Sequence, residues 1–164
     1  MAEESDPFEC RLTFLSLLQK LNASQQSIHK VASYAMRHRK LSEDLYSCLI
    51  EVLEQVKYRP FSKWEEKSCY FLFKIIASTN ARLNIIYVLD AIFSASQKSN
   101  FTGYIELTRP DLPRIIHAVV ANDAKGVVNV PNTQKIINHW KRKGLFESHI
   151  LEEAEKPLLE REQR

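Results

Sequence analysis

The sequence contains little glycine and proline and no long apolar run, and these shortages narrow the possible folds. Its 164 residues include only 3 Gly and 6 Pro, which is too little for the many turns of a fold built from short strands. No apolar run approaches the roughly 20 residues of a membrane-spanning helix. The acidic start, MAEESDPFEC, also lacks the basic and apolar segments of a signal peptide. We therefore expect an all-α protein that works inside the cell and has no membrane partner.

The motifs of common catalytic and metal sites are missing as well. The three glycines stand far apart, so the chain has neither a P-loop nor a GxGxxG motif. It has no GxSxG sequence and no set of kinase motifs, and its three cysteines form no CxxC pair. The histidines show no HExxH spacing: His29, His38, His117, His139 and His149. We expect a protein that is not an enzyme and that holds no metal or cofactor.

What the sequence does contain is typical of a folded domain. Hydrophobic residues make up 45% of it and charged residues 26%, and its length suits one domain with a substantial core. The net charge is +3, and short basic runs stand at 37–40 (RHRK) and 141–143 (KRK). Each run is either a solvated helix end, or an anion-facing surface or nuclear import signal. Because aromatic residues are not interleaved with these runs, we do not expect nucleic-acid binding.

Apolar residues recur at helical spacing along most of the chain. Pro7 suits the first turn of one helix, and Ser24 and Ser42 are placed to cap the next two. The motif SKWE (62–65) matches a capping box, and Asn80 is placed to cap the helix after it. The pattern predicts about eight helices and no strand. Since the connections are short, neighbouring helices should pack roughly antiparallel.

Glycine and proline mark the expected breaks in the second half of the chain. We expect an irregular region from Gly103 and a loop over 122–130. Pro131 should begin a helix that Gly144 ends as a left-handed residue. Pro157 should kink or break the last helix.

The stretch LNIIYVLDAIFSAS (83–96) places an acid in an otherwise apolar helix. At about 100° per residue, Tyr87, Asp90 and Ser94 fall in one narrow stripe, and apolar residues cover the rest. A buried carboxylate without a partner is costly. Asp90 therefore either bonds to a neighbouring helix or lies on the floor of a groove that takes a hydroxyl or amide from an extended peptide.

A second feature is the basic segment KIINHWKRKGLFES (135–148), in which cations and apolar residues share one helix. Charge-assisted hydrogen bonds to phosphate are strong. Lys135, Lys141 and Arg142 are therefore candidates for holding a phosphorylated peptide beside the Asp90 stripe. The alternative is that these cations form the solvated outer face of their helix.

Both stretches resemble the CTD-interacting domain (CID), the all-helical module that reads the heptad-repeat tail of RNA polymerase II. IIYVLDAIFSAS (85–96) is similar to the LLYLxDSIxxNS pattern of its central helix, and 135–148 is similar to the LxxWxxRxVF pattern of its closing helix. In that family the tail peptide lies in a groove whose floor includes the tyrosine and the aspartate of the central helix. The resemblance thus implies that Tyr87 and Asp90 line such a groove.

A closer resemblance covers residues 6–55, which include the strings DPFE, LNASQQSI and EDLYSCLIE. This segment resembles the N-terminal domain of the gamma subunits of fungal RNA polymerase II CTD kinase complexes. The resemblance implies a right-handed superhelical bundle of about eight helices over 1–150. The charged residues at 151–164 predict a charged C-terminal helix or tail, which either ends there or leads into a longer native chain.

The same resemblance implies a non-catalytic regulatory subunit that works with a cyclin and a cyclin-dependent kinase. Complexes of this kind phosphorylate the polymerase tail and promote transcription elongation and coupled mRNA processing. We accordingly expect the protein in the nucleus, with the cytoplasm as a further location.

Departures from the CID pattern affect the implied groove. Leu89 stands where readers of the tail often have Asn, and residues 94–96 (SAS) replace their Asn–Ser pair. Both changes remove side-chain hydrogen-bonding capacity. We therefore favour a regulatory scaffold with at most weak binding of the tail, and we keep an independent reader of the phosphorylated tail as the alternative.

Overall fold

The computed structural model describes residues 6–58, 81–121 and 124–162, and it describes the backbone alone for 55–58, 124, 125 and 162. In these ranges the chain is helical and contains no strand, so the expected all-α class is confirmed. The α-helices are α1 (Pro7–Gln19), α2 (Gln25–Arg37), α3 (Ser42–Tyr58), α5 (Ala81–Lys98), α6 (Gly103–Thr108), α7 (Leu112–Val119), α8 (Ala124–Lys143) and α9 (Ser148–Glu162). The short 3₁₀ turns η1 (Arg39–Leu41) and η2 (Arg109–Asp111) precede α3 and α7.

The first two helices begin where the sequence predicts. Asp6 caps α1 by accepting a 3.1 Å hydrogen bond from the Phe8 N–H, and Pro7 takes the first helical position. Ser24 caps α2 by accepting a 3.2 Å hydrogen bond from the Ser27 N–H. Each cap satisfies a backbone donor that has no partner inside its helix, and contributes about 1 kcal/mol.

Ser42 does not cap α3, contrary to the prediction. The turn η1 leads directly into α3, and Ser42 already has helical backbone angles of φ −55° and ψ −38°. A cap residue needs a non-helical backbone to present its side chain to the first turn. The predicted capping box at 62–65 and the predicted cap at Asn80 lie outside the described residues.

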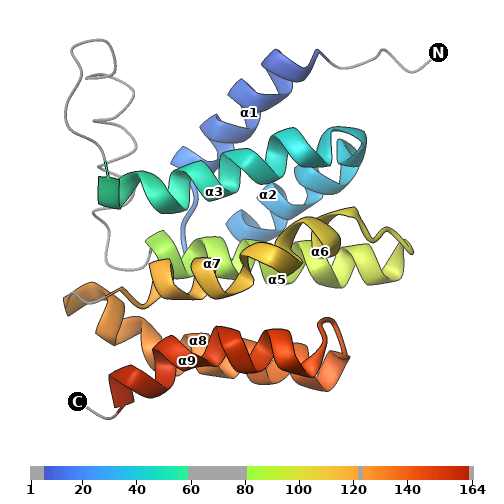
Figure 1. Ribbon diagram of the computed structural model, residues 1–164. Coiled ribbons are helices and arrows are strands. Elements are labelled where there is room, and N and C mark those ends of the chain that lie inside the picture. Colours follow the sequence, from blue (N-terminus) through green and yellow to red (C-terminus); the bar gives the residue numbers. More distant parts are fainter. Residues whose placement is uncertain (1–5, 59–80, 122–123, 163–164) are drawn as a thin grey trace.

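The helices form three successive layers along the chain (Figure 1). The first layer contains α1, α2 and α3, the second contains α5, α6 and α7, and the third contains α8 and α9. The most extensive helix contact in the described ranges joins α2 to α5, and α7 packs on α9. The first and last helices, α1 and α9, consequently lie at opposite ends of the described structure (Figure 1).

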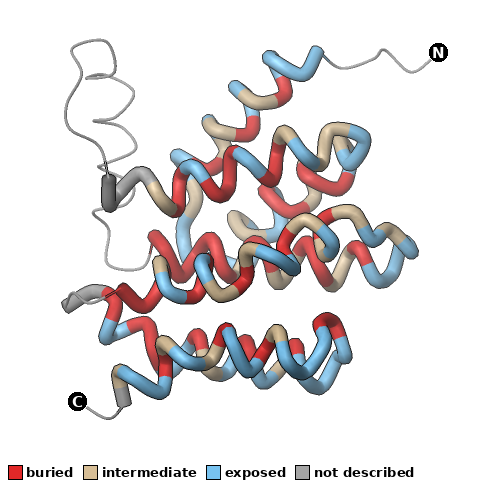
Figure 2. Tube along the Cα trace, viewed as in Figure 1, coloured by how far each residue is buried: buried red, intermediate tan, exposed pale blue. Residues whose placement is uncertain are grey.

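The central helix is α5, which packs against α2, α3, α6, α7 and α8. Ile86, Leu89 and Phe93 are completely buried on it, and buried residues gather where the layers meet (Figure 2). Burial of each such side chain contributes about 1.5–3 kcal/mol. The helix is enclosed on most of its circumference, as its nearly continuous apolar sequence predicts.

Two regions expected to be irregular are helical. Gly103 begins α6 instead of an irregular region. From Ala124 onward the expected loop over 122–130 is the first part of α8, and Pro131 lies inside that helix instead of starting it. Both predictions were wrong, because they relied on local glycine and proline signals and the sequence does not reveal the long-range contacts of these segments.

Specific contacts explain the early start of α8. Gly126 packs so closely against the end of the preceding segment that a Cβ there would lie 1.9 Å from the Ala121 carbonyl oxygen. Asn129 Nδ2 donates a 3.0 Å hydrogen bond to the Val119 carbonyl. Thr133 Oγ1 donates a 2.8 Å bond to the Asn129 carbonyl. These bonds hold the backbone on both sides of Pro131, which lacks the N–H of an ordinary helical residue.

The end of α8 follows the prediction, and α9 is continuous. Gly144 has φ 63°, and the Leu145 N–H donates a 3.2 Å bond to the Trp140 carbonyl, which is the pattern of a Schellman cap. This turn brings Leu145 and Phe146 into the core. By contrast, α9 continues through Pro157, so of the two predicted outcomes, a kink or a break, the break is wrong.

Candidate peptide-recognition site

The carboxylate of Asp90 is bonded to the neighbouring helix α8. The indole Nε1 of Trp140 donates a 2.8 Å hydrogen bond to Asp90 Oδ1, and His139 Nε2 lies 3.9 Å from the same oxygen. The Asp90 side chain is 29% exposed. Of the two alternatives that the sequence left open, a bond to a neighbouring helix therefore applies to Oδ1 of Asp90. Oδ2 has no partner among the described residues and is able to accept another hydrogen bond.

On the core side of the Asp90–Trp140 bond, an aromatic cluster packs α5 against α8. Phe93 contacts Trp140 with ring centroids 5.3 Å apart, and Phe146 lies 5.5 Å from Phe93 and 5.8 Å from Trp140. All three pairs have edge-to-face geometry, which adds about 0.5–1.5 kcal/mol per pair to the hydrophobic contribution. The Asp90–Trp140 bond thus lies at the border between this core cluster and solvent.

Tyr87 and Ser94 lie on either side of Asp90 along α5 and form a stripe with it. Each is half-buried, one turn before and one turn after Asp90. Tyr87 packs against the edge of the hydrophobic core. The three side chains that the sequence places on one face are therefore on one partly accessible face of the central helix.

The predicted cations of α8 are divided between two sides of that helix. Lys135 and Arg142 are exposed and lie one turn before and after His139, so they share its face. Lys141 instead forms an ion pair with Glu155 of α9. The structure thus places Lys135 and Arg142 on the face whose His139 approaches Asp90, and it places Lys141 on the side of α9. The assignment of these cations to a peptide site remains a prediction.

The sequence alone did not reveal the bond between Trp140 and Asp90, although both residues lie in the two stretches singled out above, 83–96 and 135–148. A buried tryptophan needs an acceptor for its indole N–H, and a half-buried aspartate needs a donor. That complementary requirement was the available signal. The pairing itself depends on the packing of helices 50 residues apart in sequence.

Elsewhere, a thiol and an imidazole meet at the contact of α1 and α2. Cys10 Sγ lies 3.6 Å from His38 Nδ1, and the His38 ring lies over Tyr34 with centroids 4.3 Å apart. Cys10 is 3% exposed. Burial raises the pKa of Tyr34 above its ordinary value, and the hydrogen bond with Cys10 raises it further. The contacts among Cys10, Tyr34 and His38 pack α1 against α2.

The described ranges show neither a metal-binding cluster nor a membrane-spanning helix. They contain no cluster of three or more side chains with the chemistry and proximity to bind a metal ion. They also contain no helix whose length and apolar character would let it cross a membrane.

Comparison with known proteins gives consistent matches. Residues 5–60 and 72–147 match the family of CTD kinase subunit gamma CTK3. A CTD kinase subunit gamma of Schizosaccharomyces pombe is 34% identical over 150 residues, which are 91% of this chain and 59% of that protein. This chain therefore spans less than two thirds of the length of that relative.

A solved structure of a CID of Ctk3 superposes with a TM-score of 0.78 and 33% sequence identity. The superposition covers 98% of this chain and 100% of that one. The expected CID-like helical fold is therefore confirmed.

Proposed function

Because the chain belongs to the CTD kinase subunit gamma family, we propose that it is a non-catalytic regulatory subunit of a CTD kinase complex. In this role it binds the cyclin and the cyclin-dependent kinase of the complex, and it regulates phosphorylation of the RNA polymerase II tail. The observation that carries the proposal is the 34% identity to a CTD kinase subunit gamma over 91% of the chain. The complex would act in the nucleus, in transcription elongation and coupled mRNA processing.

The geometry of the candidate site supports a role in binding. Asp90 is the acid of the stripe, and its Oδ1 accepts the hydrogen bond from the indole of Trp140, which ties two helices together. Its Oδ2 is left to accept a hydrogen bond from a bound peptide. The stripe therefore combines a fixed position with an available acceptor.

Co-expression with the cyclin and kinase subunits tests the proposal. The tagged 164-residue chain should co-purify with both subunits through gel filtration, and the purified complex should phosphorylate a heptad-repeat peptide faster than the cyclin–kinase pair alone. Heat-denatured chain, added to the cyclin–kinase pair, serves as the control for nonspecific effects. Absence of both co-purification and stimulation would contradict the proposed role.

An independent reader of the phosphorylated tail is the second candidate function. It is favoured by the partly exposed carboxylate of Asp90 and by the exposed Lys135 and Arg142 on the same face as His139. Titration of the isolated chain with phosphorylated and unphosphorylated heptad peptides distinguishes the two roles. Micromolar binding that is lost in Asp90→Ala or Tyr87→Phe would support the reader and would sink a scaffold without tail binding.

A further inference from the structure

Helix α1 presents an apolar stripe to solvent. Phe8 is 66% exposed and Leu12 52% exposed, and their i, i+4 spacing places them on the same face. Leu15 is half-buried and continues the stripe toward the core. The opposite face of α1 is already used, since Cys10, Phe14 and Leu18 are buried there. Folding of the described residues therefore leaves two large apolar side chains on this helix without a partner.

The stripe faces the solvent beside α3. Phe14 packs on Tyr34 of α2, whereas Arg11 reaches α3. At 3.6 residues per turn, Leu15 lies about 40° and Phe8 about 60° beyond Arg11, on the side away from Phe14. The Arg11 side chain thus separates the core of the first layer from the exposed stripe. A helix placed against Phe8 and Leu12 would also meet the outer face of α3.

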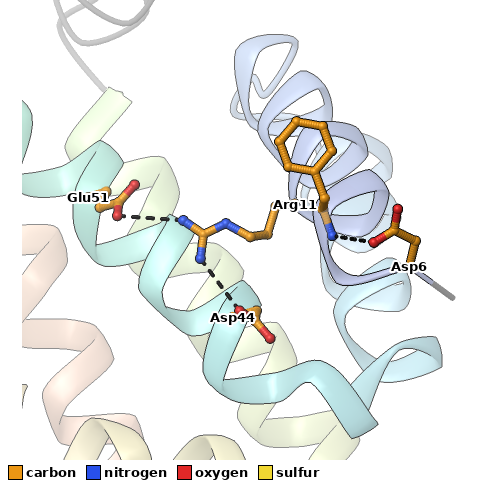
Figure 3. A network of polar contacts seen from close by, with 5 residues as sticks. Asp6, Arg11, Asp44 and Glu51 are labelled. Carbon is orange, nitrogen blue, oxygen red and sulfur yellow. Dashed lines mark hydrogen bonds and ion pairs between the residues drawn. The ribbon is translucent and has the colours of Figure 1, made fainter.

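The outer face of α3 is acidic. Asp44 Oδ1 and Glu51 Oε1 lie 3.5 Å and 3.6 Å from the two terminal nitrogens of Arg11 (Figure 3). The two acidic side chains are 39% and 51% exposed. One guanidinium between two carboxylates leaves a net negative charge. This acidic face contrasts with the chain as a whole, whose net charge is +3.

We propose that the α1–α3 surface, formed by Phe8, Leu12, Leu15, Asp44 and Glu51, binds a basic amphipathic helix of another subunit of the kinase complex. The inference rests on the proposed function, because that function supplies the partner subunits. Apolar anchors at i, i+4 spacing suit the apolar face of such a helix, and flanking Lys or Arg residues would pair with the half-exposed acids. A second copy of this chain suits the surface less, since it would bring the same acids against one another.

The test compares matched variants in co-purification of the full 164-residue chain with the cyclin and kinase subunits. Phe8→Ser with Leu12→Ser should reduce the recovered partner at least about tenfold, because two anchor side chains are lost. Asp44→Lys with Glu51→Lys should reduce it as well, and it leaves the apolar stripe of α1 unchanged. Leu159→Ser is the control, since Leu159 is 51% exposed on α9. Circular dichroism melting verifies that each variant folds.

The possible results distinguish failure of the proposed surface from failure of the proposed function. If the unaltered chain recovers its partners and both double variants recover them equally well, the α1–α3 surface is wrong and the proposed function stands. If the unaltered chain recovers neither partner, both proposals fall. Sedimentation velocity supplies the remaining outcome: a dimer of the unaltered chain that Phe8→Ser with Leu12→Ser dissociates would assign the surface to a second copy and overturn the proposal.

Discussion

Trp140 and Asp90 are 50 residues apart in sequence and are joined by a 2.8 Å hydrogen bond from the indole Nε1 to the carboxylate Oδ1. The bond lies between the aromatic cluster of α5 and α8 and the exposed cations of α8. It therefore belongs both to the packing of the domain and to its candidate recognition surface. Substitutions at Asp90 should separate these two contributions.

Asp90→Ala should lower the free energy of unfolding by about 1–3 kcal/mol, because the buried indole N–H of Trp140 loses its acceptor. Asp90→Asn should cost less, since its amide oxygen is able to accept the same bond. Urea unfolding monitored by tryptophan fluorescence measures both changes. Ser94→Ala on the same stripe is the control. An Asp90→Ala protein as stable as the control would show that the bond contributes nothing.

Gly126→Ala should destabilise the domain more than Gly144→Ala. A Cβ at Gly126 would lie 1.9 Å from the backbone oxygen of Ala121, so the start of α8 must shift; overpacking of this kind costs about 1–3 kcal/mol. At Gly144 nothing lies within 4 Å, and only the φ of 63° opposes a side chain, at a cost of about 1–2 kcal/mol. Thermal melts of the two variants decide the order. A reversed order would contradict the close approach of Gly126 to Ala121.

The stability of the domain should fall in alkaline solution, partly through Tyr46. Burial, together with the 2.7 Å hydrogen bond from its hydroxyl to Asp111 Oδ2, raises the pKa of Tyr46 above its ordinary value of 10. The folded chain therefore keeps the proton at a pH where the unfolded chain loses it. Stability from this group is fully present below pH 10 and is lost as the pH rises above that value.

Tyr46→Phe isolates this contribution. At pH 7 the variant should be less stable by about 1–2 kcal/mol, because the bond to Asp111 is lost. The difference should shrink as the pH rises above 10, since the variant has no phenol to ionise at this position. Urea unfolding at several pH values measures the difference. A constant difference across that range would contradict the raised pKa of Tyr46.

Arg142→Ala and Lys141→Ala form a matched pair for tail binding. We expect the isolated chain to bind a phosphorylated heptad peptide weakly, with shifts of NMR signals around Tyr87 and Ser94. Arg142→Ala should reduce these shifts, because Arg142 is exposed on the face of His139. Lys141→Ala should leave them nearly unchanged, since Glu155 already engages the Lys141 ammonium. Equal effects of the two substitutions would contradict the division of α8 into two sides.

Local chemistry made the helical class and the Asp90 stripe predictable from the sequence. Periodic apolar residues, the Ser24 cap and the left-handed Gly144 act within a few residues, and the structure has all three. The start of α8 was not predictable in this way. It depends on Gly126 meeting Ala121 and on Asn129 bonding to Val119, and both contacts form only after two helices pack.

The candidate site shows the same division between local and long-range information. Helical spacing places Tyr87, Asp90 and Ser94 on one stripe because that stripe is a property of one helix. The separation of Lys141 from Arg142 depends on where α9 lies, since Glu155 of α9 takes Lys141. The same limit applies to Ser42: its capping role is lost because η1 joins α3 without an intervening turn.

The enclosure of α5 by five other helices has a consequence for how the domain moves. Amide hydrogens of such a helix exchange with solvent mainly when the whole domain unfolds, whereas peripheral helices open more often. We therefore expect the stripe of Tyr87, Asp90 and Ser94 to lie on a slowly exchanging element that keeps its shape when a ligand binds. A peptide that binds there would have to fit the stripe as it stands.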